Sequence, residues 1–520
     1  MSDTKINGAE SLLQSLIKEG VEVCFTNPGT SEMHMVAAIG KTTEMRSVLA
    51  LFEGVCTGAA DGYGRMARKP ACTLLHLGPG LSNGSANLHN AKKASTPVLN
   101  LIGDHATYHK QFDAPLNSDI EGLSAPVSDW TKTVSTAKEL PVEAVNAVAV
   151  ANSGAGKIAT LIVPADCAWD ESEPVAVSGN PLAPAAVADD QINSVAALLQ
   201  NEKSTVILMN NLGLETEAME LADKVAQTTG ARLFCDTFTR LLPRGEGRVS
   251  IERLGYFAEQ AEEQLAGVEQ FIMIGTKAPV AFFAYPGKAS EFYPADSTRI
   301  TLAGVDDDPV DALTRLSEVL GCEKATPRLV PMKKPGLGSG ELSPRTIGMT
   351  FAELLPTDAI VVDEGATSGG GCFMASAQVE PHDWLSLTGG SIGYGLPVAV
   401  GAAVACPERK VVCIHGDGGA MYTIQSLWTM ARENLDVCIV IFANRKYQIL
   451  QVELARVGAQ SMTKKTLDML DISNPDLNFV QMAEGMGVTA SRATTIEEFN
   501  VQYEDAMNSR GPRLIEAILA

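Results

Sequence analysis

Apolar residues in this chain gather in short continuous runs, and amphipathic stretches of helical period separate the runs. The runs lie at residues 21–25, 71–77, 98–103, 158–164, 205–211, 231–237, 270–275, 298–304, 359–365, 384–389, 410–418, 436–444 and 513–519. Strands buried on both faces of a parallel sheet have such continuous patterns, whereas strands with one wet face alternate. Stretches such as 7–20 and 423–435 predict helices between the strands. The pattern as a whole predicts an α/β protein with parallel sheets.

Two segments without a hydrophobic period divide the chain. Residues 172–190 contain three prolines, and residues 325–344 contain four prolines and three glycines. Clusters of proline and glycine are typical of linkers. We therefore predict three consecutive α/β domains, each of ordinary size, at residues 1–172, 191–325 and 343–520.

Composition narrows the classes of function. Hydrophobic residues make up 45% of the 520 positions and charged residues 20%, as in globular proteins. No apolar run reaches the ~18 residues that span a bilayer, so we expect a cytoplasmic protein without a membrane partner. The net charge of −22 disfavours nucleic acid as a partner, because binding to a phosphate backbone needs a positive field. The ten cysteines form no CxxC pair, which favours free thiols over a disulfide framework.

The segment 410–450 contains the most informative polar residues. Asp417 follows one predicted strand, and Asn444 ends the next strand 27 positions later. Both side chains are expected at the carboxyl edge of one parallel sheet, where their oxygens suit Mg²⁺. Close approach of an anion to the backbone is allowed by the neighbouring glycines, Gly416, Gly418 and Gly419. The segment predicts a metal-bridged diphosphate, and the alternative is an ordinary strand-to-helix turn with a capping aspartate.

Glu53 lies between a strand-like stretch and a helical stretch rich in glycine and alanine, within residues 49–70. Apolar neighbours would desolvate this carboxylate in part and raise its pKa, which favours a role in sharing a proton. The alternative is an acid in the first turn of a helix, stabilised by the helix dipole.

These segments together resemble the thiamine-diphosphate-dependent enzymes of the acetolactate synthase, pyruvate oxidase and benzoylformate decarboxylase superfamily. The resemblance covers nearly the whole chain, through NPGTSE, the Glu53 segment, LHLGPGLSN, GGSIGYGLPVAVGAA and the Asp417–Asn444 unit. It implies a first domain that binds the aminopyrimidine, a structural middle domain and a third domain that binds the diphosphate. It also implies a homodimer or homotetramer with active sites at the subunit interface.

The resemblance implies roles for individual residues. The Mg²⁺ ligands would be Asp417, Asn444 and the backbone carbonyl of Lys446. Ile392 matches the bulky apolar residue that bends the cofactor, and Glu53 matches the glutamate that bonds the pyrimidine N1′ nitrogen. The implied cofactor-binding set is Glu53, Ala366, Thr367, Gly390, Ile392, Gly416, Asp417, Gly418, Gly419, Tyr422, Asn444, Lys446, Tyr447 and Ile449. Several relatives carry FAD in the middle domain, but no residue between 191 and 325 marks such a site.

The implied substrate is a small 2-oxo acid, and the product distinguishes two activities. Acetolactate-synthase-like carboligation is preferred on overall similarity, although Glu453 occupies the position of the synthase tryptophan that selects the second substrate. A non-oxidative decarboxylase of benzoylformate type is the alternative, because His76 matches its active-site histidine and Thr30 its substrate-contacting serine. A catalytically silent cofactor-binding relative is disfavoured by the presence of Glu53.

Overall fold

The computed structural model describes residues 6–173, 183–458 and 462–519. Its N-terminal part contains a six-stranded parallel sheet in the order β3-β2-β4-β5-β7-β6. The strands are β2 (Val23–Asn27), β3 (Arg46–Leu49), β4 (Ala71–Leu75), β5 (Val98–Asp104), β6 (Trp130–Thr133) and β7 (Ile158–Pro164), and a short antiparallel pair joins β1 (Ile6–Asn7) to β8 (Glu171–Ser172). The helices are α1 (Gly8–Lys18), α2 (Met33–Ile39), α3 (Glu53–Ala67), α4 (Leu77–Lys93), α5 (Ile120–Ser124), α6 (Leu140–Ala151) and α7 (Ala165–Trp169).

The middle part of the chain forms a five-stranded parallel sheet in the order β12-β10-β9-β13-β14. Its strands are β9 (Thr205–Met209), β10 (Arg232–Cys235), β12 (Glu252–Arg253), β13 (Gln270–Ile274) and β14 (Thr298–Ala303). Its helices are α8 (Asp189–Leu199), α9 (Thr216–Thr229), α10 (Ala258–Gln264) and α11 (Pro309–Leu320).

The C-terminal part forms a seven-stranded sheet in the order β11-β16-β15-β17-β18-β20-β19, parallel except for the edge strand β11. The strands are β11 (Leu242–Arg244), β15 (Ala359–Glu364), β16 (His382–Ser386), β17 (Val411–Gly416), β18 (Val437–Ala443), β19 (Thr489–Ala493) and β20 (Arg513–Ile518). The helices are α12 (Pro344–Leu354), α13 (Ala366–Ala375), α14 (Gly395–Ala405), α15 (Asp417–Ala420), α16 (Ser426–Arg432), α17 (Gln448–Arg456), α18 (Lys464–Asp468), α19 (Phe479–Gly485) and α20 (Ile496–Asn508).

The predicted fold class is confirmed, because each continuous apolar run overlaps a strand of a mainly parallel sheet. One strand departs from the sequential order of domains: β11 belongs to the middle stretch of the chain but pairs antiparallel with β16. The domain limits remain predictions, and the first predicted linker falls partly outside the described residues, at 174–182. All ten cysteines are free.

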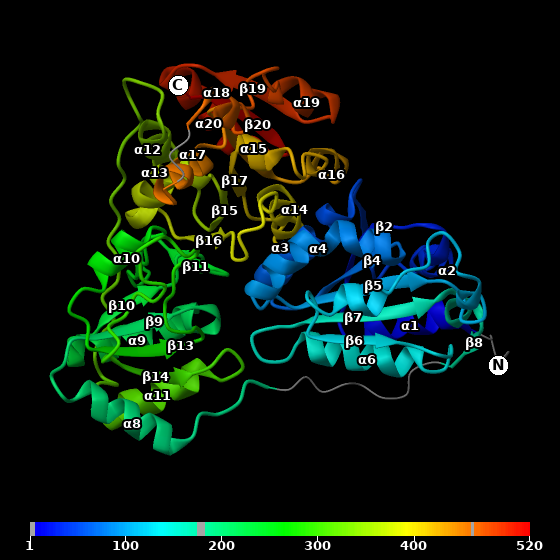
Figure 1. Cartoon of the computed structure of the whole chain (residues 1–520), viewed down its shortest axis with the longest axis horizontal. Helices are drawn as coiled ribbons and strands as arrows, with labels where there is room; N and C mark the ends of the chain where they lie inside the picture. The colour runs from blue at the N-terminus through cyan, green and yellow to red at the C-terminus, as the bar shows by residue number, and fades with distance from the viewer. Residues whose placement is uncertain (1–5, 174–182, 459–461, 520) are drawn as a thin grey trace.

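Helices α3 and α14 form the most extensive contact between the N-terminal and C-terminal parts, which lie at the right and at the top of Figure 1. Glycine permits this contact. A Cβ atom on Gly62 would lie 2.2 Å from the carbonyl oxygen of Val398, and one on Gly401 would lie 1.9 Å from that of Ala59. Since real Cβ atoms do not approach so closely, larger residues at these two positions would force the helices apart.

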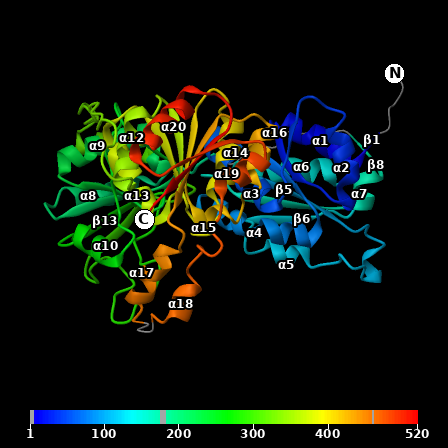
Figure 2. The same cartoon turned by 90° about the horizontal axis from the view of Figure 1, so that it is seen from above.

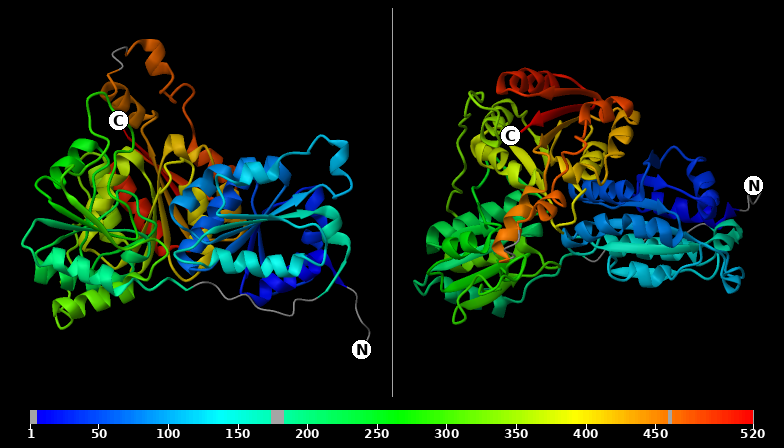
Figure 3. Two further views of the ribbon diagram at one scale, coloured as in Figure 1. Left: turned by 60° about the horizontal axis from the view of Figure 1, so that its bottom comes forward. Right: turned by 45° about the horizontal axis from the view of Figure 1, so that its top comes forward.

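Helices α17 and α18 project from the C-terminal sheet on the side of the middle part, as Figures 2 and 3 show in orange. Within the described residues, no helix is long and apolar enough to cross a bilayer.

Candidate active site

Asp417 and Asn444 lie at the carboxyl edge of the seven-stranded sheet. Strand β17 ends at Gly416 and pairs in parallel with β18, which ends at Ala443, so the two polar residues follow neighbouring strands. Asp417 Oδ2 accepts the backbone N–H of Arg445 at 2.6 Å, which ties the two strand ends together. The expected adjacency of the two strands is therefore present.

The environment of Asp417 is suited to a cation. The residue is only 4% exposed, and its carboxylate accepts the backbone N–H groups of Arg445 and Gly418. Burial raises the pKa of Asp417 above its usual range, while these N–H donors act in the opposite direction. Asn444 Oδ1 accepts the backbone N–H of Lys446 at 3.2 Å, so the third predicted ligand belongs to the same turn. Carboxylate, amide and carbonyl oxygens are the ligands that Mg²⁺ prefers, and the donor set fits it.

Gln448 connects this turn to the start of α13. Its Oε1 accepts from Asn444 Nδ2 at 3.1 Å and from Thr367 Oγ1 at 3.5 Å. Ala366, the residue before Thr367, has a φ of +46°, a left-handed conformation that is strained for a residue with a Cβ atom. A Cβ atom on Gly418 would lie 2.4 Å from the ring of Tyr447, so only glycine allows this ring to cover the turn after β17. The structure thus brings together the residues predicted to bind the diphosphate.

A loop between β16 and α14 borders the same region and carries Ile392. This side chain is 37% exposed, and Tyr422 beside the loop is 54% exposed. A Cβ atom on Gly393 would lie 2.5 Å from the Tyr422 Cβ atom, which shows how closely the loop and this tyrosine pack. Gly390 has a φ of +73°, which the turn requires and glycine adopts without strain. Two large apolar side chains therefore remain uncovered beside a polar turn.

Glu364, at the end of β15, is a buried acid of this region that the sequence reasoning missed. Its two carboxylate oxygens accept the backbone N–H groups of Gly393 and Gly395, each at 2.6 Å. His415 Nε2 lies 3.0 Å from Glu364 Oε2, although the atoms are not aligned for a hydrogen bond. Burial disfavours the charged form of His415, but the Glu364 carboxylate, the Gly416 carbonyl and Asp363 together outweigh it, so the pKa of His415 lies above its usual value. An acid as the last residue of a buried strand was the available signal.

Glu53 is the first residue of α3, in the N-terminal part of the chain. Its side chain is half-buried, and its Oε2 accepts a hydrogen bond from Asn83 Nδ2 at 2.9 Å. A Cβ atom on Gly80 would lie 3.4 Å from Glu53 Oε1 and 3.5 Å from the Cβ atom of His76. Glu53 and His76 therefore lie on either side of Gly80.

His76 is held by a buried acid, Glu32. His76 Nδ1 lies 2.9 Å from Glu32 Oε2, and Glu32 has no exposed surface. Glu32 also accepts the N–H of Gly29 at 2.7 Å and the hydroxyl of Ser31 at 2.5 Å. Ser31, rather than the exposed Thr30, lies within 3.2 Å of His76. The role predicted for Thr30 stays a prediction.

The candidate residues form two groups within one chain. One group surrounds Asp417 in the C-terminal part, and the other contains Glu53 and His76 in the N-terminal part. Within residues 6–173, 183–458 and 462–519, no hydrogen bond or ion pair joins Glu53 or His76 to Asp417 or Asn444.

Two descriptions of known protein domains match the two parts of the chain that carry these groups of residues. The description "Thiamine pyrophosphate enzyme, N-terminal TPP binding domain" matches residues 6–123, and "Thiamine pyrophosphate enzyme, C-terminal TPP binding domain" matches residues 369–517. The "Putative acetolactate synthase large subunit IlvX" of Mycobacterium tuberculosis is 47% identical over 515 residues, which cover 99% of both chains.

Two further relatives are more distant. The benzoylformate decarboxylase of Pseudomonas aeruginosa is 28% identical over 541 residues, with 96% of each chain covered. The solved structure of a thiamine-diphosphate-dependent 4-hydroxybenzoylformate decarboxylase from Rhodococcus jostii RHA1 superimposes with a TM-score of 0.85 at 22% identity, covering 98% of each chain. At that identity, the structural likeness shows the fold.

Proposed function

The chain belongs to the thiamine pyrophosphate enzyme family, and from this premise we propose that it uses thiamine diphosphate and Mg²⁺ to decarboxylate a 2-oxo acid and join the product to a second one. The observation that carries the proposal is the pair Asp417 and Asn444 on neighbouring parallel strands, within a chain 47% identical to the named acetolactate synthase relative. We place the reaction in the cytoplasm, as expected from the sequence.

In this proposal the residues around Asp417 hold the diphosphate end of the cofactor. Asp417, Asn444 and the carbonyl of Lys446 bind Mg²⁺, which offsets the cost of burying the Asp417 carboxylate. Thr367 and Gly418 contact the phosphates, together with the other cofactor residues predicted from the sequence, and the exposed side chain of Ile392 supports the thiazolium ring.

Glu53 acts at the other end of the cofactor. When bound, thiamine diphosphate would supply a thiazolium ring that accepts the electron pair released when the 2-oxo acid loses carbon dioxide. Glu53 exchanges a proton with the N1′ atom of the pyrimidine, and the hydrogen bond from Asn83 orients its carboxylate. Ile392 and Tyr422 exclude water from the reacting centre, because their exposed apolar surface becomes covered when the site closes.

We propose further that two subunits complete each site, as a homodimer or homotetramer. Residues 1–172 of one subunit would supply Glu53 and His76, and residues 343–520 of another would supply the metal ligands. The separation of the two residue groups within a single chain supports this arrangement. So does the exposure of large apolar side chains beside both groups, namely Leu51, Ile392, Tyr422 and Leu450.

A second candidate function is non-oxidative decarboxylation of an aryl 2-oxo acid. The pairing of His76 with the buried Glu32 favours it, because a carboxylate on Nδ1 leaves Nε2 to give or take a proton. A silent cofactor-binding relative is the third candidate, and it would bind the cofactor without turnover.

Calorimetry and product analysis test the proposal together. Thiamine diphosphate is titrated into cofactor-free protein with and without Mg²⁺, and mass spectrometry identifies the products from pyruvate and from benzoylformate. We expect Mg²⁺-dependent binding and acetolactate from pyruvate. Benzaldehyde from benzoylformate without acetolactate would favour the second candidate, and binding without any product would favour the third.

Two variants separate binding from catalysis. Asp417→Asn should abolish Mg²⁺-dependent binding, whereas the exposed Asp505→Asn should leave it unchanged. Glu53→Gln should retain binding and lower turnover by about 10²–10⁴, the range for loss of a proton-transfer group. Absence of any heat of binding in the unmodified protein would overturn the proposal.

A further inference from the structure

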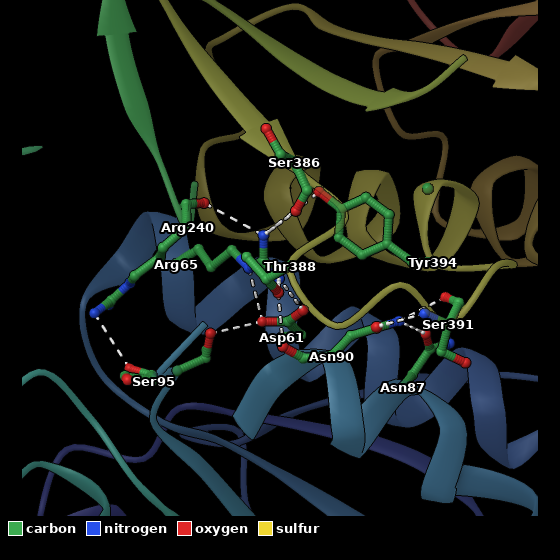
Figure 4. A network of polar contacts seen from close by, with 12 residues as sticks. Asp61, Arg65, Asn87, Asn90, Ser95, Arg240, Ser386, Thr388, Ser391 and Tyr394 are labelled. Carbon is green, nitrogen blue, oxygen red and sulfur yellow. Dashed lines mark hydrogen bonds and ion pairs between the residues drawn. The ribbon is translucent and has the colours of Figure 1, made fainter. Parts of the chain in front are cut away.

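The loop between β16 and α14, with its flanking residues 386–395, is bonded through several of its backbone groups to distant parts of the chain. Figure 4 shows it lying against the N-terminal part, with Arg65, Asn87 and Asn90 directed toward it. Arg65 Nη1 donates to the carbonyl oxygen of Ser386 at 2.8 Å, and its Nη2 donates to Thr388 Oγ1 at 3.1 Å.

Asn90, on α4, bonds both polar backbone groups of the residue before Ile392. Its Oδ1 accepts the N–H of Ser391 at 3.1 Å, and its Nδ2 donates to the Ser391 carbonyl at 2.8 Å. The carbonyl of Asn90 itself accepts from Thr388 Oγ1 at 2.8 Å. Asn90 is fully buried, so water cannot replace these bonds.

Asn87, one turn earlier on α4, bonds the other side of Ile392 and the helix that carries Glu53. Its Nδ2 donates to the carbonyl of Gly393 at 3.4 Å and to the carbonyl of Gly54 at 2.8 Å. Its Oδ1 accepts from Asn90 Nδ2 at 3.1 Å. One amide group therefore links the first turn of α3, directly after Glu53, to the residue directly after Ile392.

Glu364 holds the same loop from the C-terminal side. It accepts the N–H groups of Gly393 and Gly395, and the hydroxyl group of Thr423, also in the C-terminal part, donates to the Gly393 carbonyl at 2.8 Å. The bond from Asn87 to the same carbonyl comes from the opposite side of the loop. The backbone beside Ile392 is fixed by Asn87 and Asn90 on one side and by Glu364 on the other, while the Ile392 side chain projects and stays 37% exposed.

We propose that Asn87 and Asn90 are positioning residues that hold the backbone on both sides of Ile392, and thereby set the affinity for the cofactor that Ile392 supports. The inference rests on the proposed function for the role of Ile392. Neither asparagine touches the cofactor in this proposal, and both act through the backbone that they bond. Ordinary packing between two parts of a chain would not need bonds on both sides of a single exposed residue.

The first test measures the loop without any cofactor. Hydrogen–deuterium exchange, read by mass spectrometry, reports the protection of backbone amides in residues 386–395 of the cofactor-free protein. Asn90→Ala removes the acceptor of the Ser391 N–H, and we expect its exchange to rise about tenfold, as for loss of one buried hydrogen bond. The exposed Asn146→Ala, which removes an asparagine bonded to Glu143 on α6, is the matched control and should change nothing in this loop.

The second test separates positioning from stability. Asn87→Asp places a buried carboxylate against two carbonyl oxygens, and burial raises the pKa of such a group. Protonation at lower pH restores one donor, so we expect the affinity for thiamine diphosphate to be about tenfold weaker at pH 8 and to recover toward pH 6. Asn87→Ala should also bind thiamine diphosphate more weakly, but without recovery toward pH 6. The melting temperature of each variant shows how far the substitution lowers stability.

His89→Ala provides a mild variant in case the buried substitutions prevent folding. His89 is exposed, and its Nε2 lies 3.0 Å from the Gly389 carbonyl at the start of the same loop. We expect a smaller rise in exchange of residues 386–395 and a smaller loss of affinity. The proposal is overturned if loop protection is unchanged, or if protection falls while the cofactor affinity and its pH profile stay as in the unmodified protein. Failure of the unmodified protein to bind the cofactor would instead overturn the proposed function.

Discussion

The hydroxyl group of Tyr285 donates a hydrogen bond to Glu453 Oε2 at 2.7 Å and thereby joins the middle part of the chain to α17. Arg456, on the same helix, forms an ion pair with Glu259 and lies over the ring of Phe257, 4.5 Å from its centroid. Helix α17 begins four residues after Asn444, so the middle part holds the helix that leaves the candidate metal site. Glu453 does not point freely to solvent, which would be the usual position of a glutamate.

We expect Tyr285→Phe to alter use of the substrate more than binding of the cofactor. Glu453 Oε1 is already buried without a hydrogen-bond partner among the described residues, and the variant would leave the other oxygen without its tyrosine donor. A hydrogen bond to a charged group is worth about 1.5–3 kcal/mol, so a rise of about tenfold in KM for the 2-oxo acid is expected. Steady-state kinetics measures KM, and calorimetry should find the affinity for thiamine diphosphate unchanged within about twofold.

Tyr293→Phe is the matched control for this substitution. Tyr293 also donates to a glutamate, Glu291, at 2.7 Å, but this pair is on an exposed part of the middle region. Its removal should leave KM unchanged. Equal effects of the two substitutions would contradict a specific role for the contact between Tyr285 and α17.

Where the three parts of the chain meet, replacement of Arg65 should lower the free energy of unfolding more than replacement of any other single residue. Its guanidinium group forms two hydrogen bonds with Asp61, at 2.8 and 2.7 Å, and also donates to the carbonyl groups of Arg240 and Ser386 (Figure 4). Both members of the ion pair are at most 1% exposed. Arg65→Met leaves Asp61 as an uncompensated buried charge, so a loss of about 3–5 kcal/mol in the free energy of unfolding is expected.

Urea denaturation measures this loss, and scanning calorimetry tests whether the parts then unfold separately. Arg68→Met is the control, because the ion pair of Arg68 with Glu215 is exposed and should contribute only about 0–1 kcal/mol. Combining Arg65→Met with Asp61→Asn removes the unpaired charge and should recover part of the stability. Similar losses for Arg65→Met and Arg68→Met would contradict the assigned importance of the buried pair.

The sequence predicted the central strands well and the edge strands poorly, for a physical reason. Central strands of a parallel sheet are buried on both faces and need continuous apolar runs, as at Val437–Ala443. Edge strands are less buried and do not need continuous apolar runs. Arg46–Leu49 and Thr489–Ala493 are polar and partly exposed, and only their pairing with neighbours reveals them.

The same distinction applies to the candidate site. Asp417 and Asn444 could be predicted to be close because a single strand–helix–strand unit fixes their arrangement. Glu32 and His76 are 44 residues apart, and their contact depends on β2 and β4 being neighbours although β3 intervenes in the sequence. Glu364 gains its partners only when a loop about 30 residues later returns to it, and no local pattern encodes that return.

Stability should fall as pH rises through the range in which Asp236 loses its proton. Burial raises the pKa of Asp236 to about 6, in spite of hydrogen bonds from Thr276 and Asn210. A raised carboxyl pKa means that the folded state binds the proton more tightly than the unfolded state does. The contribution of Asp236 to the free energy of unfolding is therefore complete below the pKa of the unfolded state, near 4, and is lost between about pH 4 and pH 6.

Asp236→Asn isolates this contribution, because the amide cannot ionise. The difference in unfolding free energy between the variant and the unmodified protein should shift in favour of the variant from pH 4 to pH 7, by at most about 3 kcal/mol. Urea denaturation at a series of pH values measures this difference. Asp505→Asn, an exposed position, should give no such shift. A difference that stays constant with pH would show that Asp236 does not ionise with a raised pKa.

Glu32→Gln should distinguish a proton-transfer role of His76 from a structural one. Glu32 fixes the proton on His76 Nδ1, and a glutamine amide at the same place can instead donate to that nitrogen and move the proton to Nε2. If the protein releases an aldehyde through His76, that release should fall about 10²–10⁴-fold, whereas carboligation that does not use His76 should change little. Product analysis across pH measures both. Ser31→Ala, which removes one hydroxyl donor to Glu32 without altering the charge of Glu32, is the control and should leave the ratio of the two products unchanged. An equal fall of both products in Glu32→Gln would assign the pair a structural role.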